Sequence, residues 1–527
     1  MQKNITLKLL PSEAANEATV KQYIAKAEAV QAETITGYSI LKQSIDARSK
    51  QPWVNLTLQA FINEPFQERE LLQFNFRDVS KADKKIVIIG AGPAGLFAAL
   101  QLIESGIKPI LLERGKDVRA RRRDLAMLNK EGEVNPESNY CFGEGGAGTY
   151  SDGKLYTRSS KRGDINRILN LFVHFGAEEK ILYEAHPHIG TNKLPGIITA
   201  MREKIIECGG DFLFEKKVVD LIIQNQEIKG VKTQDGNSFD GDAVILATGH
   251  SARDIFYLLH DKKILIESKP FALGVRVEHP QSLIDNSQYH CTVRSEYLPP
   301  ASYSWVQQVD GKGVFSFCMC PGGIIAPAAT SPGELVVNGW SPSKRNNPYA
   351  NSGIVVTLEE NDMAAYKKHG ALAALHFQQA VEKKAFDVGG GKFVAPAQRL
   401  VDFTNNKISS SLPDCSYLPG TNSSNLKDVL PDFVHKSLQT AFVEYGKKMP
   451  ARLGGKGYFT NDAIVVATES RSSSPVRIPR DSNTLEHPQI KKLYPCGEGA
   501  GYAGGIVSAA MDGERVAKMI ETAINKN

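Results

Sequence analysis

The clearest change in hydrophobic pattern along the chain begins at residue 86. Four apolar residues, Ile86 to Ile89, predict a buried strand, and a longer apolar segment at 96–103 predicts a helix. A short apolar stretch at 109–112 then predicts a second strand, which ends at Glu113. A strand, a helix and a returning strand are typical of a βαβ unit in a parallel sheet.

The same periodicities predict elements on both sides of this unit. In the first 80 residues we expect strands at 5–10, 38–45 and 54–62 and a helix at 14–32. After the βαβ unit we expect, in chain order, a helix at 117–130, a helix at 194–208, an antiparallel insertion at 212–223 and 227–233, a strand at 243–247, strands at 314–318 and 335–339, helices at 363–384 and 434–447, a strand at 493–496 and a helix at 508–524.

These elements predict an α/β protein of several domains. We expect a Rossmann-like domain with a parallel sheet and an antiparallel insertion, an α+β cap or substrate domain, and a small ferredoxin-like α+β domain at the N-terminus. A length of 527 residues agrees with two or three such domains. The expected boundaries are 1–80 for the N-terminal domain, 81–270 for the first part of the Rossmann-like domain, 271–455 for the cap and 456–527 for the last part of the Rossmann-like domain.

Composition and charge narrow the function classes only a little. With 42% hydrophobic and 23% charged residues, the chain has the composition of a soluble globular protein. A net charge of +5 is mild for this length and does not by itself argue for nucleic acid or membrane partners. Seven cysteines without regular spacing predict reduced thiols, and the first residues show no signal peptide. We therefore expect a cytoplasmic protein without a membrane span.

The glycines after the first strand indicate a dinucleotide-binding turn. Gly90, Gly92 and Gly95 have the spacing G-x-G-x-x-G. In such a turn the first glycine permits the bend, the second lets the backbone approach a pyrophosphate, and the third lets the helix pack on the strand. Glu113, beside Arg114, would then accept hydrogen bonds from the adenosine ribose. The candidates for contact with the phosphates at the helix N-terminus are Gly90, Gly92, Pro93, Ala94 and Gly95.

Two other glycine runs have the same spacing but do not predict a second nucleotide fold. The run at 143–148 follows no apolar strand. The run at 499–504 follows a strand, but the remaining residues leave little room for a returning strand and its acid. One dinucleotide is implied, and a reductase with a built-in nicotinamide domain is not expected.

Several longer motifs give the chain a family resemblance. The segments 86–95, 247–249 and 497–498 resemble the two-dinucleotide-fold flavoproteins, whose first domain binds FAD. The more specific motifs resemble the family of FAD-dependent dehydrogenases, also labelled NAD-utilizing dehydrogenases, over nearly the whole chain. These motifs lie at 44–48, 139–154, 315–323 and 472–477.

The resemblance implies tightly but non-covalently bound FAD, with NAD(P)H as a diffusible donor, in an oxidoreductase of the bacterial cytosol; it does not imply a substrate. It assigns the pyrophosphate to the glycines of the first turn and the ribose to Glu113. It places the backbone near Val218 at the adenine. It also assigns the cofactor to Thr248 and Gly249 at a strand end, to Gly497 and Glu498, to the start of the last helix at Gly504, Gly505 and Ile506, and to the loop glycines Gly145, Gly146 and Gly148.

Two of these assignments keep an alternative. Glu498 stands where the related flavoproteins carry aspartate, whose carboxylate bonds a ribityl or ribose hydroxyl, and the side chain of Glu498 is one methylene longer. The glycine-rich loop at 139–153 either lies against the flavin or is an ordinary surface turn. The N-terminus of the last helix would face the pyrimidine edge of the flavin, where its dipole stabilises the anion of the reduced ring.

The candidate catalytic residues are Cys318, Cys320 and His250. A thiol near a flavin attacks the ring or exchanges with a disulfide, and two cysteines one residue apart in a strand would share a face. The alternative is two small buried residues in a sheet. His250 is either a proton donor near the flavin or a structural histidine. Arg471 and Arg477 either bind an anionic substrate or lie in an exposed loop, and no metal site is expected.

The leading function is a FAD-dependent oxidoreductase that transfers a hydride or electrons through the flavin to a small molecule. One alternative is a flavin-dependent RNA- or tRNA-modifying enzyme, which rests on the N-terminal domain and the basic run at 119–123. That run is more typical of a solvated helix face. The other alternative is a FAD-holding redox sensor without turnover.

Overall fold

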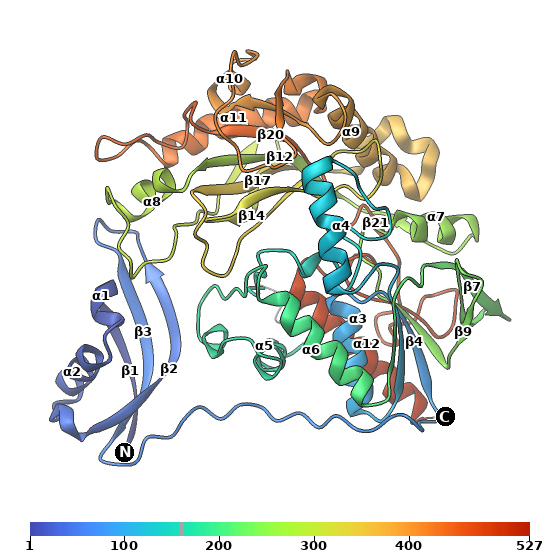
Figure 1. Ribbon diagram of the computed structural model, residues 1–527, viewed down its shortest axis with the longest axis horizontal. Coiled ribbons are helices and arrows are strands. Elements are labelled where there is room, and N and C mark those ends of the chain that lie inside the picture. Colours follow the sequence, from blue (N-terminus) through green and yellow to red (C-terminus); the bar gives the residue numbers. More distant parts are fainter. Residues whose placement is uncertain (158–162, 527) are drawn as a thin grey trace.

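Three of the sheets organise the molecule in the computed structural model, which describes residues 1–157 and 163–526. A three-stranded sheet belongs to the N-terminal part, a five-stranded parallel sheet to the Rossmann-like part, and a seven-stranded sheet to the cap. Figure 1 shows the N-terminal sheet set apart on the left, with the seven-stranded sheet above the parallel sheet. The α/β class predicted from the hydrophobic pattern is confirmed.

The N-terminal sheet has one buried face because its strands alternate. It consists of β1 (Gln2–Leu9), β2 (Ile35–Asp46) and β3 (Trp53–Ile62), antiparallel in the order β1-β3-β2. The buried face packs against Val20 and Ile24 of α2 (Glu17–Glu28), which follows the short α1 (Pro11–Ala14). A complete ferredoxin-like β-α-β-β-α-β unit would continue after β3 with a further helix and a fourth strand.

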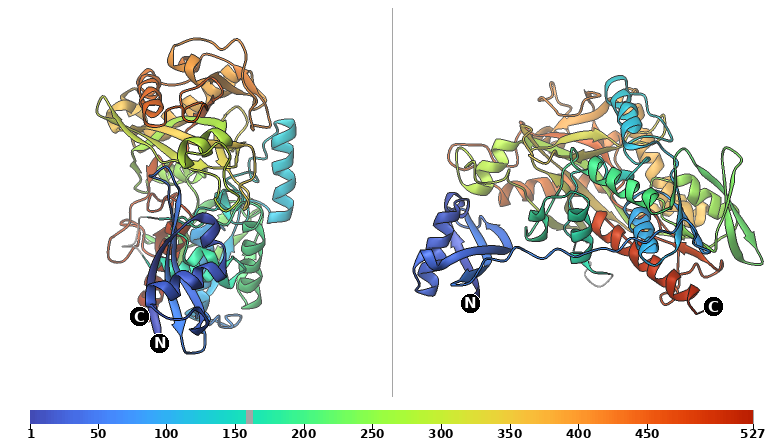
Figure 2. Two further views of the ribbon diagram at one scale, coloured as in Figure 1. Left: turned by 90° about the vertical axis from the view of Figure 1, so that its left-hand side faces the viewer. Right: turned by 60° about the horizontal axis from the view of Figure 1, so that its bottom comes forward.

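Residues 63–84 join this sheet to the rest of the chain. They have no helix or strand, and Figure 1 and the right-hand view of Figure 2 show them extended along one side of the molecule. The backbone N–H of Val79 donates to the carbonyl oxygen of Cys208 at 2.7 Å. The edge strand β2 also contacts the segment after α5 (Ile165–His174) directly, because Gln43 exchanges backbone hydrogen bonds with Tyr183 and Ala185.

The parallel sheet is covered on both faces, which explains the continuous apolar runs of its strands. Its order is β22-β10-β4-β5-β6. One face packs on α3 (Pro93–Glu104) and α12 (Ile506–Ile524), and the other packs on α7 (Arg253–Asp261) and the antiparallel insertion. The strands are β4 (Lys85–Ile89), β5 (Lys108–Leu112), β6 (Asp211–Leu213), β10 (Ala243–Leu246) and β22 (Leu493–Pro495).

The antiparallel insertion begins later than the sequence predicts. It consists of β7 (Val218–Gln224), β8 (Glu227–Thr233) and β9 (Ser238–Asp240). Phe212, predicted to start the insertion, lies in β6 and pairs with Leu111 of the parallel sheet. The expected strand at 212–223 is therefore wrong as one element. Both halves are apolar, so the hydrophobic pattern did not reveal the turn between them.

The seven-stranded sheet has one face packed on α11 (Asp432–Lys448) and the other turned towards the parallel-sheet part (Figure 1). Val275, Val314 and Ile354 share a core with Phe442 of α11. The alternate residues, which include Arg276, Phe315 and Phe317, lie on the opposite face. In sheet order the strands are β13 (Val306–Val309), β14 (Lys312–Cys320), β17 (Tyr349–Leu358), β12 (Phe271–Pro280), β20 (Ile464–Glu469), β18 (Ala395–Arg399) and β19 (Thr421–Ser423).

The predicted helix at 363–384 is divided. Residues Glu360–Leu372 form 3-10 turns, and α9 (Ala373–Gly389) follows, because Gly370 at φ +56° interrupts the helix. The helices that were not predicted include α7, α8 (Gln281–Tyr289), α10 (Leu400–Thr404) and α5, although α5 begins with an Asp164 cap that the sequence displays. The remaining elements are α4 (Val118–Glu131), α6 (Leu194–Glu207), β11 (Glu267–Ser268), β15 (Ile324–Pro327), β16 (Val337–Trp340) and β21 (Val476–Arg477). In the part of the chain described, no helix is both long and apolar enough to cross a membrane.

Candidate functional site

Three strand ends meet at the carboxyl edge of the parallel sheet, which is where ligands bind in open α/β sheets. β4 leads to Gly90, β10 leads to Thr248, and β22 leads to Gly497. These ends are in tight contact: a Cβ atom on Gly90 would lie 2.8 Å from the carbonyl oxygen of Ala247, and one on Gly499 would lie 2.0 Å from that of Thr248. The structure therefore brings together segments that lie far apart in the sequence.

In the first glycine turn, neighbouring atoms pack closely against Gly90 and Gly95 but leave open space beside Gly92. Gly90 has φ +104°, and a Cβ atom on Gly95 would lie 2.0 Å from the carbonyl oxygen of Gly90. By contrast, no atom lies within 4 Å of a Cβ atom placed on Gly92. Close packing thus requires two of the glycines, while the third borders open space where a ligand can approach the backbone.

The glycine-rich loop at 145–148 lies directly on this turn. The N–H of Gly145 donates to the carbonyl oxygen of Ala91 at 2.9 Å. A Cβ atom on Gly146 would lie 3.1 Å from the Cα atom of Gly92, and one on Gly148 would lie 3.4 Å from the side chain of Ile506. The loop therefore connects the first turn with the start of α12.

Two helices begin at this place without a side-chain cap. Gly92 occupies the N-cap of α3 and Gly505 the N-cap of α12, and neither receives a cap from a side chain. The first N–H groups of a helix need acceptors, and the helix dipole makes an anion favourable there. Since these N-termini lie at the carboxyl edge of one sheet, the site suits an extended anionic ligand.

Glu113 is buried, with 4% of its surface exposed, and organises the site through backbone hydrogen bonds. Its carboxylate accepts from the N–H groups of Ala91, Gly115 and Gly143, each at 2.9 Å. The side chain that the sequence assigns to the ribose therefore also ties the first turn to the glycine-rich loop. The motif spacing did not reveal this role.

Arg114 and Val218 are the two other residues predicted to lie near the adenosine. Arg114 pairs with Glu137 at 2.7 Å and Asp254 at 2.8 Å, and its guanidinium stacks 4.3 Å from the ring centre of Phe142. Val218 is buried at the start of β7.

The basic run at 119–123 is not a uniformly solvated face, and this expectation is wrong for its middle residue. Arg121 is completely buried. Its guanidinium donates to four carbonyl oxygens, those of Asn139, Tyr140, Glu144 and Gly146, at 2.8–3.0 Å. A buried charge needs such compensation. Arg121 therefore holds the glycine-rich loop, while its neighbours in the run, Arg119, Arg122 and Arg123, are exposed.

His250 and Glu498 come together although 248 positions separate them. Nδ1 of His250 lies 3.3 Å from Oε1 of Glu498, and both side chains are partly exposed. The two residues follow the ends of the neighbouring strands β10 and β22. An imidazole beside a carboxylate can hold or move a proton near neutral pH.

Cys318 and Cys320 lie at the end of β14, next to the loop that follows the glycine run. Nζ of Lys154 lies 3.7 Å from Sγ of Cys318 and 3.6 Å from Sγ of Cys320. The strand is irregular here, because its pairing with β17 shifts between Phe317 and Cys320. The pair therefore does not belong to the regular strand that the sequence predicts.

A cleft of about 740 Å³ opens on the same face of the seven-stranded sheet. Phe315 and Phe317 of β14 form part of its apolar wall, and Glu359 and Glu360 lie at its rim. The other lining residues are Pro270, Phe271, Ala272, Thr357, Leu358, Asn361, Ser472 and Ser473. Its size is that of a small-molecule site.

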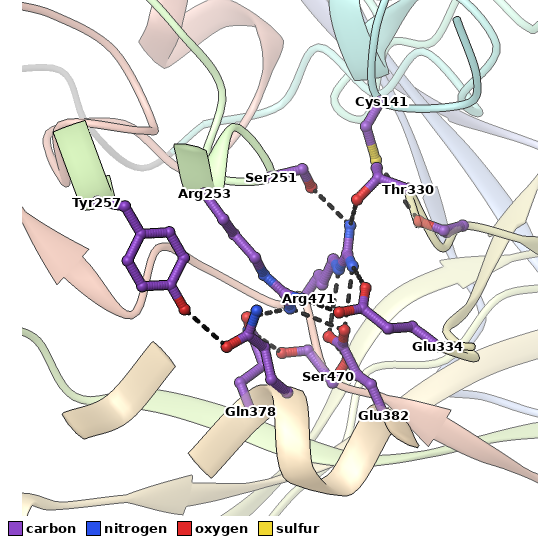
Figure 3. A network of polar contacts seen from close by, with 12 residues as sticks. Cys141, Ser251, Arg253, Tyr257, Thr330, Glu334, Gln378, Glu382, Ser470 and Arg471 are labelled. Atoms are coloured by element: carbon purple, nitrogen blue, oxygen red, sulfur yellow. Dashed lines mark hydrogen bonds and ion pairs between the residues drawn. The ribbon is translucent and has the colours of Figure 1, made fainter. Parts of the chain in front are cut away.

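Arg471 is buried and paired, so the two interpretations of it, as an anion-binding or an exposed arginine, are both wrong. Only 8% of its surface is exposed. Its guanidinium lies 3.0 Å from Glu382 and 3.2 Å from Glu334 (Figure 3). Arg253 of α7 contacts the same two carboxylates at 2.7 and 2.9 Å. Arg477 is exposed, as one of the two interpretations expects, but it lies in the short strand β21 and not in a loop.

This network joins the two large parts of the molecule. Arg253 lies on a helix of the parallel-sheet part, and Glu382 lies on α9 of the cap. Burial alone would raise the pKa of Glu382, but the two guanidinium groups outweigh burial and hold its pKa below the ordinary value. Two arginines and two glutamates thus form a balanced set of buried charges between the parts.

Family models match three separate segments of the chain. Residues 84–257 match the family model described as pyridine nucleotide-disulphide oxidoreductase, and residues 270–472 match the model described as FAD-dependent protein, C-terminal domain-like. Residues 1–61 match a domain of unknown function.

Three individual proteins are similar to different extents. A protein of Clostridium beijerinckii, described as uncharacterized, is 38% identical over 509 residues, which cover 93% of each chain. The tRNA uridine 5-carboxymethylaminomethyl modification enzyme MnmG of Alkaliphilus metalliredigens is 29% identical over 181 residues, or 33% of this chain and 25% of that protein. The structure of a geranylgeranyl bacteriochlorophyll reductase-like protein of Thermoplasma acidophilum is 13% identical over 84% of this chain and 80% of that chain, with a TM-score of 0.34.

Proposed function

This chain belongs to a family of FAD-dependent oxidoreductases together with the Clostridium beijerinckii protein, and from this premise we propose that it binds FAD at the carboxyl edge of its parallel sheet and transfers a hydride or electrons to a small molecule. The observation that carries the proposal is the meeting of three strand ends with two uncapped helix N-termini at one edge. FAD has the extended shape and the central pyrophosphate that such an edge accommodates.

The first turn and the start of α12 offer FAD backbone groups of the kind it requires. Gly92 borders the open space, so its backbone and the N–H groups of α3 would hold the pyrophosphate. The start of α12 at Gly505 and Ile506 would face the flavin, together with the loop glycines. When bound there, FAD would supply the two-electron chemistry.

The carboxylate of Glu113 already accepts three backbone N–H groups. Each carboxylate oxygen has room for about two hydrogen bonds, so one further bond to a ribose hydroxyl remains compatible with its position. We propose that Glu113 performs both tasks. Val218, Thr248, Gly249 and Gly497 remain in this proposal as backbone contacts to the two ends of the cofactor.

The protein's own groups have separate roles in the proposed reaction. The cleft beneath the seven-stranded sheet, with its apolar wall at Phe315 and Phe317, would hold the substrate and exclude water. His250, oriented by Glu498, would hold or deliver a proton at the end of β10. A diffusible NAD(P)H is the proposed electron donor, and the finer class of NAD-utilizing dehydrogenases is proposed on the motifs alone.

FAD binding is tested by substitution of Gly92. We expect purified wild-type protein to be yellow, with the absorbance of oxidised flavin near about 450 nm. Gly92→Val should weaken FAD binding by roughly 100-fold or more, because the new side chain occupies the approach to the pyrophosphate. The measurement is FAD titration into stripped protein, followed by flavin fluorescence.

Gly196→Val is the matched control, since a Cβ atom on Gly196 of α6 also meets no atom within 4 Å. It should bind FAD like the wild type. Equal FAD affinity of the Gly92 and Gly196 variants would contradict the proposed site. Flavin that is bound but never reoxidised by any acceptor would instead favour a sensor without turnover.

A tRNA-modifying function has one observation in its favour, the similarity to MnmG, which covers a quarter of that enzyme's length. Against it, Arg121 points inward, so the basic helix offers fewer cations to a phosphate backbone than its sequence suggests. We expect gel-shift experiments with tRNA at physiological salt to show no binding tighter than the non-specific range of roughly 1–100 µM. If the protein binds tRNA more tightly than this, and if Arg122→Ala and Arg123→Ala weaken that binding, the tRNA function would be supported.

A further inference from the structure

Two thiols and a lysine meet beneath the seven-stranded sheet, outside the residues proposed to hold FAD. Lys154 follows the glycine-rich loop, and its ammonium group contacts Cys318 and Cys320 at 3.7 and 3.6 Å. All seven cysteines of the chain are free thiols. Among the described cysteines, no other pair has a lysine within hydrogen-bonding distance of both sulfurs.

An irregular backbone brings the two sulfurs close together. In a regular strand, residues two apart have Cα atoms roughly 6.6 Å apart with parallel side chains, near the upper limit for a disulfide. Here Cys318 has φ +49°, a left-handed conformation that costs a non-glycine residue about 1 kcal/mol or more. At this bulge Sγ of Cys320 donates to the carbonyl oxygen of Cys318 at 3.2 Å, and both sulfurs lie within 3.7 Å of Nζ of Lys154. Such strain at a non-glycine residue is typical of functional positions.

The surrounding charges favour a thiolate on Cys318. The neighbouring Cys320 thiol lowers the pKa of Cys318 well below its ordinary value, and Lys154 and Arg276 reinforce this against the effect of burial. The neighbouring Cys318, together with burial, raises the pKa of Cys320. Of the two thiols, Cys318 is therefore the one that these neighbours favour as a thiolate.

Lys154 is itself held in place as a cation. Its Nζ lies 3.4 Å from Asp152, which also accepts a hydrogen bond from Arg345 at 2.8 Å. Burial would lower the pKa of Lys154, but Asp152 and the two thiols outweigh burial and raise it. Cys318 remains partly exposed, so a reagent can reach it, whereas Cys320 is buried behind it.

We propose that Cys318 and Cys320 form a redox-active thiol pair that reduces a low-molecular-weight disulfide, with Lys154 as the positioning residue for the Cys318 thiolate. The Cys318 thiolate attacks one sulfur of the substrate, which breaks the S–S bond, forms a mixed disulfide and releases the first thiolate to take a proton from water. Cys320 then attacks the sulfur of Cys318, and its proton passes to the second leaving thiolate. The substrate gains two electrons as two thiols, and the pair loses two electrons as a disulfide.

The first test measures the reactivity of the thiols on the full-length protein with FAD bound. Iodoacetamide alkylation, followed by peptide mass spectrometry between pH 5 and 10, should give Cys318 a midpoint below the ordinary thiol value of about 8.5. Near pH 6.5 it should react at least about tenfold faster than the partly exposed controls Cys141, Cys291 and Cys415. Lys154→Met should raise the alkylation midpoint of Cys318, whereas Lys154→Arg, which keeps the positive charge, should leave that midpoint close to the wild-type value.

The second test follows the disulfide itself. Oxidised glutathione should remove two thiols per chain and leave a product two hydrogens lighter, linked between Cys318 and Cys320, which dithiothreitol reverses. Cys320→Ser should stop at a glutathione adduct on Cys318, and Cys318→Ser should form neither product. A Cys318 midpoint unchanged by Lys154→Met, or glutathione adducts spread equally over Cys141 and Cys291, would overturn the proposal. Flavin absorbance of the same samples reports FAD binding separately, so a failure of the proposed FAD site would be recognised as such.

Discussion

Arg471→Met is expected to lower the free energy of unfolding by about 3–5 kcal/mol, because it leaves buried carboxylates with one arginine fewer. Glu382 is completely buried and is shared by Arg471 and Arg253. Without Arg471, the buried carboxylate of Glu382 keeps only one of its two arginine partners, Arg253. Chemical denaturation at pH 7, followed by far-UV circular dichroism, measures the loss.

The matched control is Arg477→Met, six positions further on and exposed. It should change the free energy of unfolding by less than about 0.5 kcal/mol, as substitutions at such surface positions do. The double variant Arg471→Met with Glu382→Gln should recover part of the loss, because it removes the unpaired charge as well. Equal stability of the two arginine variants would show that the network does not join the two parts.

Glu113→Ala is expected to affect stability and FAD binding together. The substitution leaves the N–H groups of Ala91, Gly115 and Gly143 without their acceptor. Each unsatisfied buried donor costs roughly 1–3 kcal/mol, so a loss of about 3–9 kcal/mol in the free energy of unfolding is expected for the three donors. FAD affinity should fall as well, since the glycine-rich loop loses its tie to the first turn.

Glu133→Ala is the control for this variant, because Glu133 is exposed just after α4. Thermal unfolding with and without added FAD separates the two effects. If Glu113 served only the ribose, its alanine variant would keep the unfolding temperature of the stripped wild type and lose only the shift caused by FAD. That result would contradict the structural role of the carboxylate.

Local pattern was sufficient for most of the parallel sheet but not for the seven-stranded sheet, of whose strands only β14 was predicted. The strand at Ile86–Ile89 and the helix after it followed from apolar runs, and the glycine spacing predicted the turn between them. The hydrophobic pattern did not separate two apolar strands that follow each other closely. It joined Phe212 to the insertion, although Phe212 belongs to the parallel sheet. A break that glycine imposes, such as Gly370 at φ +56°, was likewise hidden within a helical pattern.

The sequence by itself determined the class of the fold and the turn that suits a dinucleotide, because both depend on spacings of a few residues. Only the tertiary structure decided which distant residues share a site. It placed Glu113 under three backbone N–H groups, turned Arg121 and Arg471 inward, and set Lys154 beside Cys318. The physical reason is that a polar side chain is directed by the partners that compensate its burial, and those partners come from other strands and loops that no local pattern connects to it.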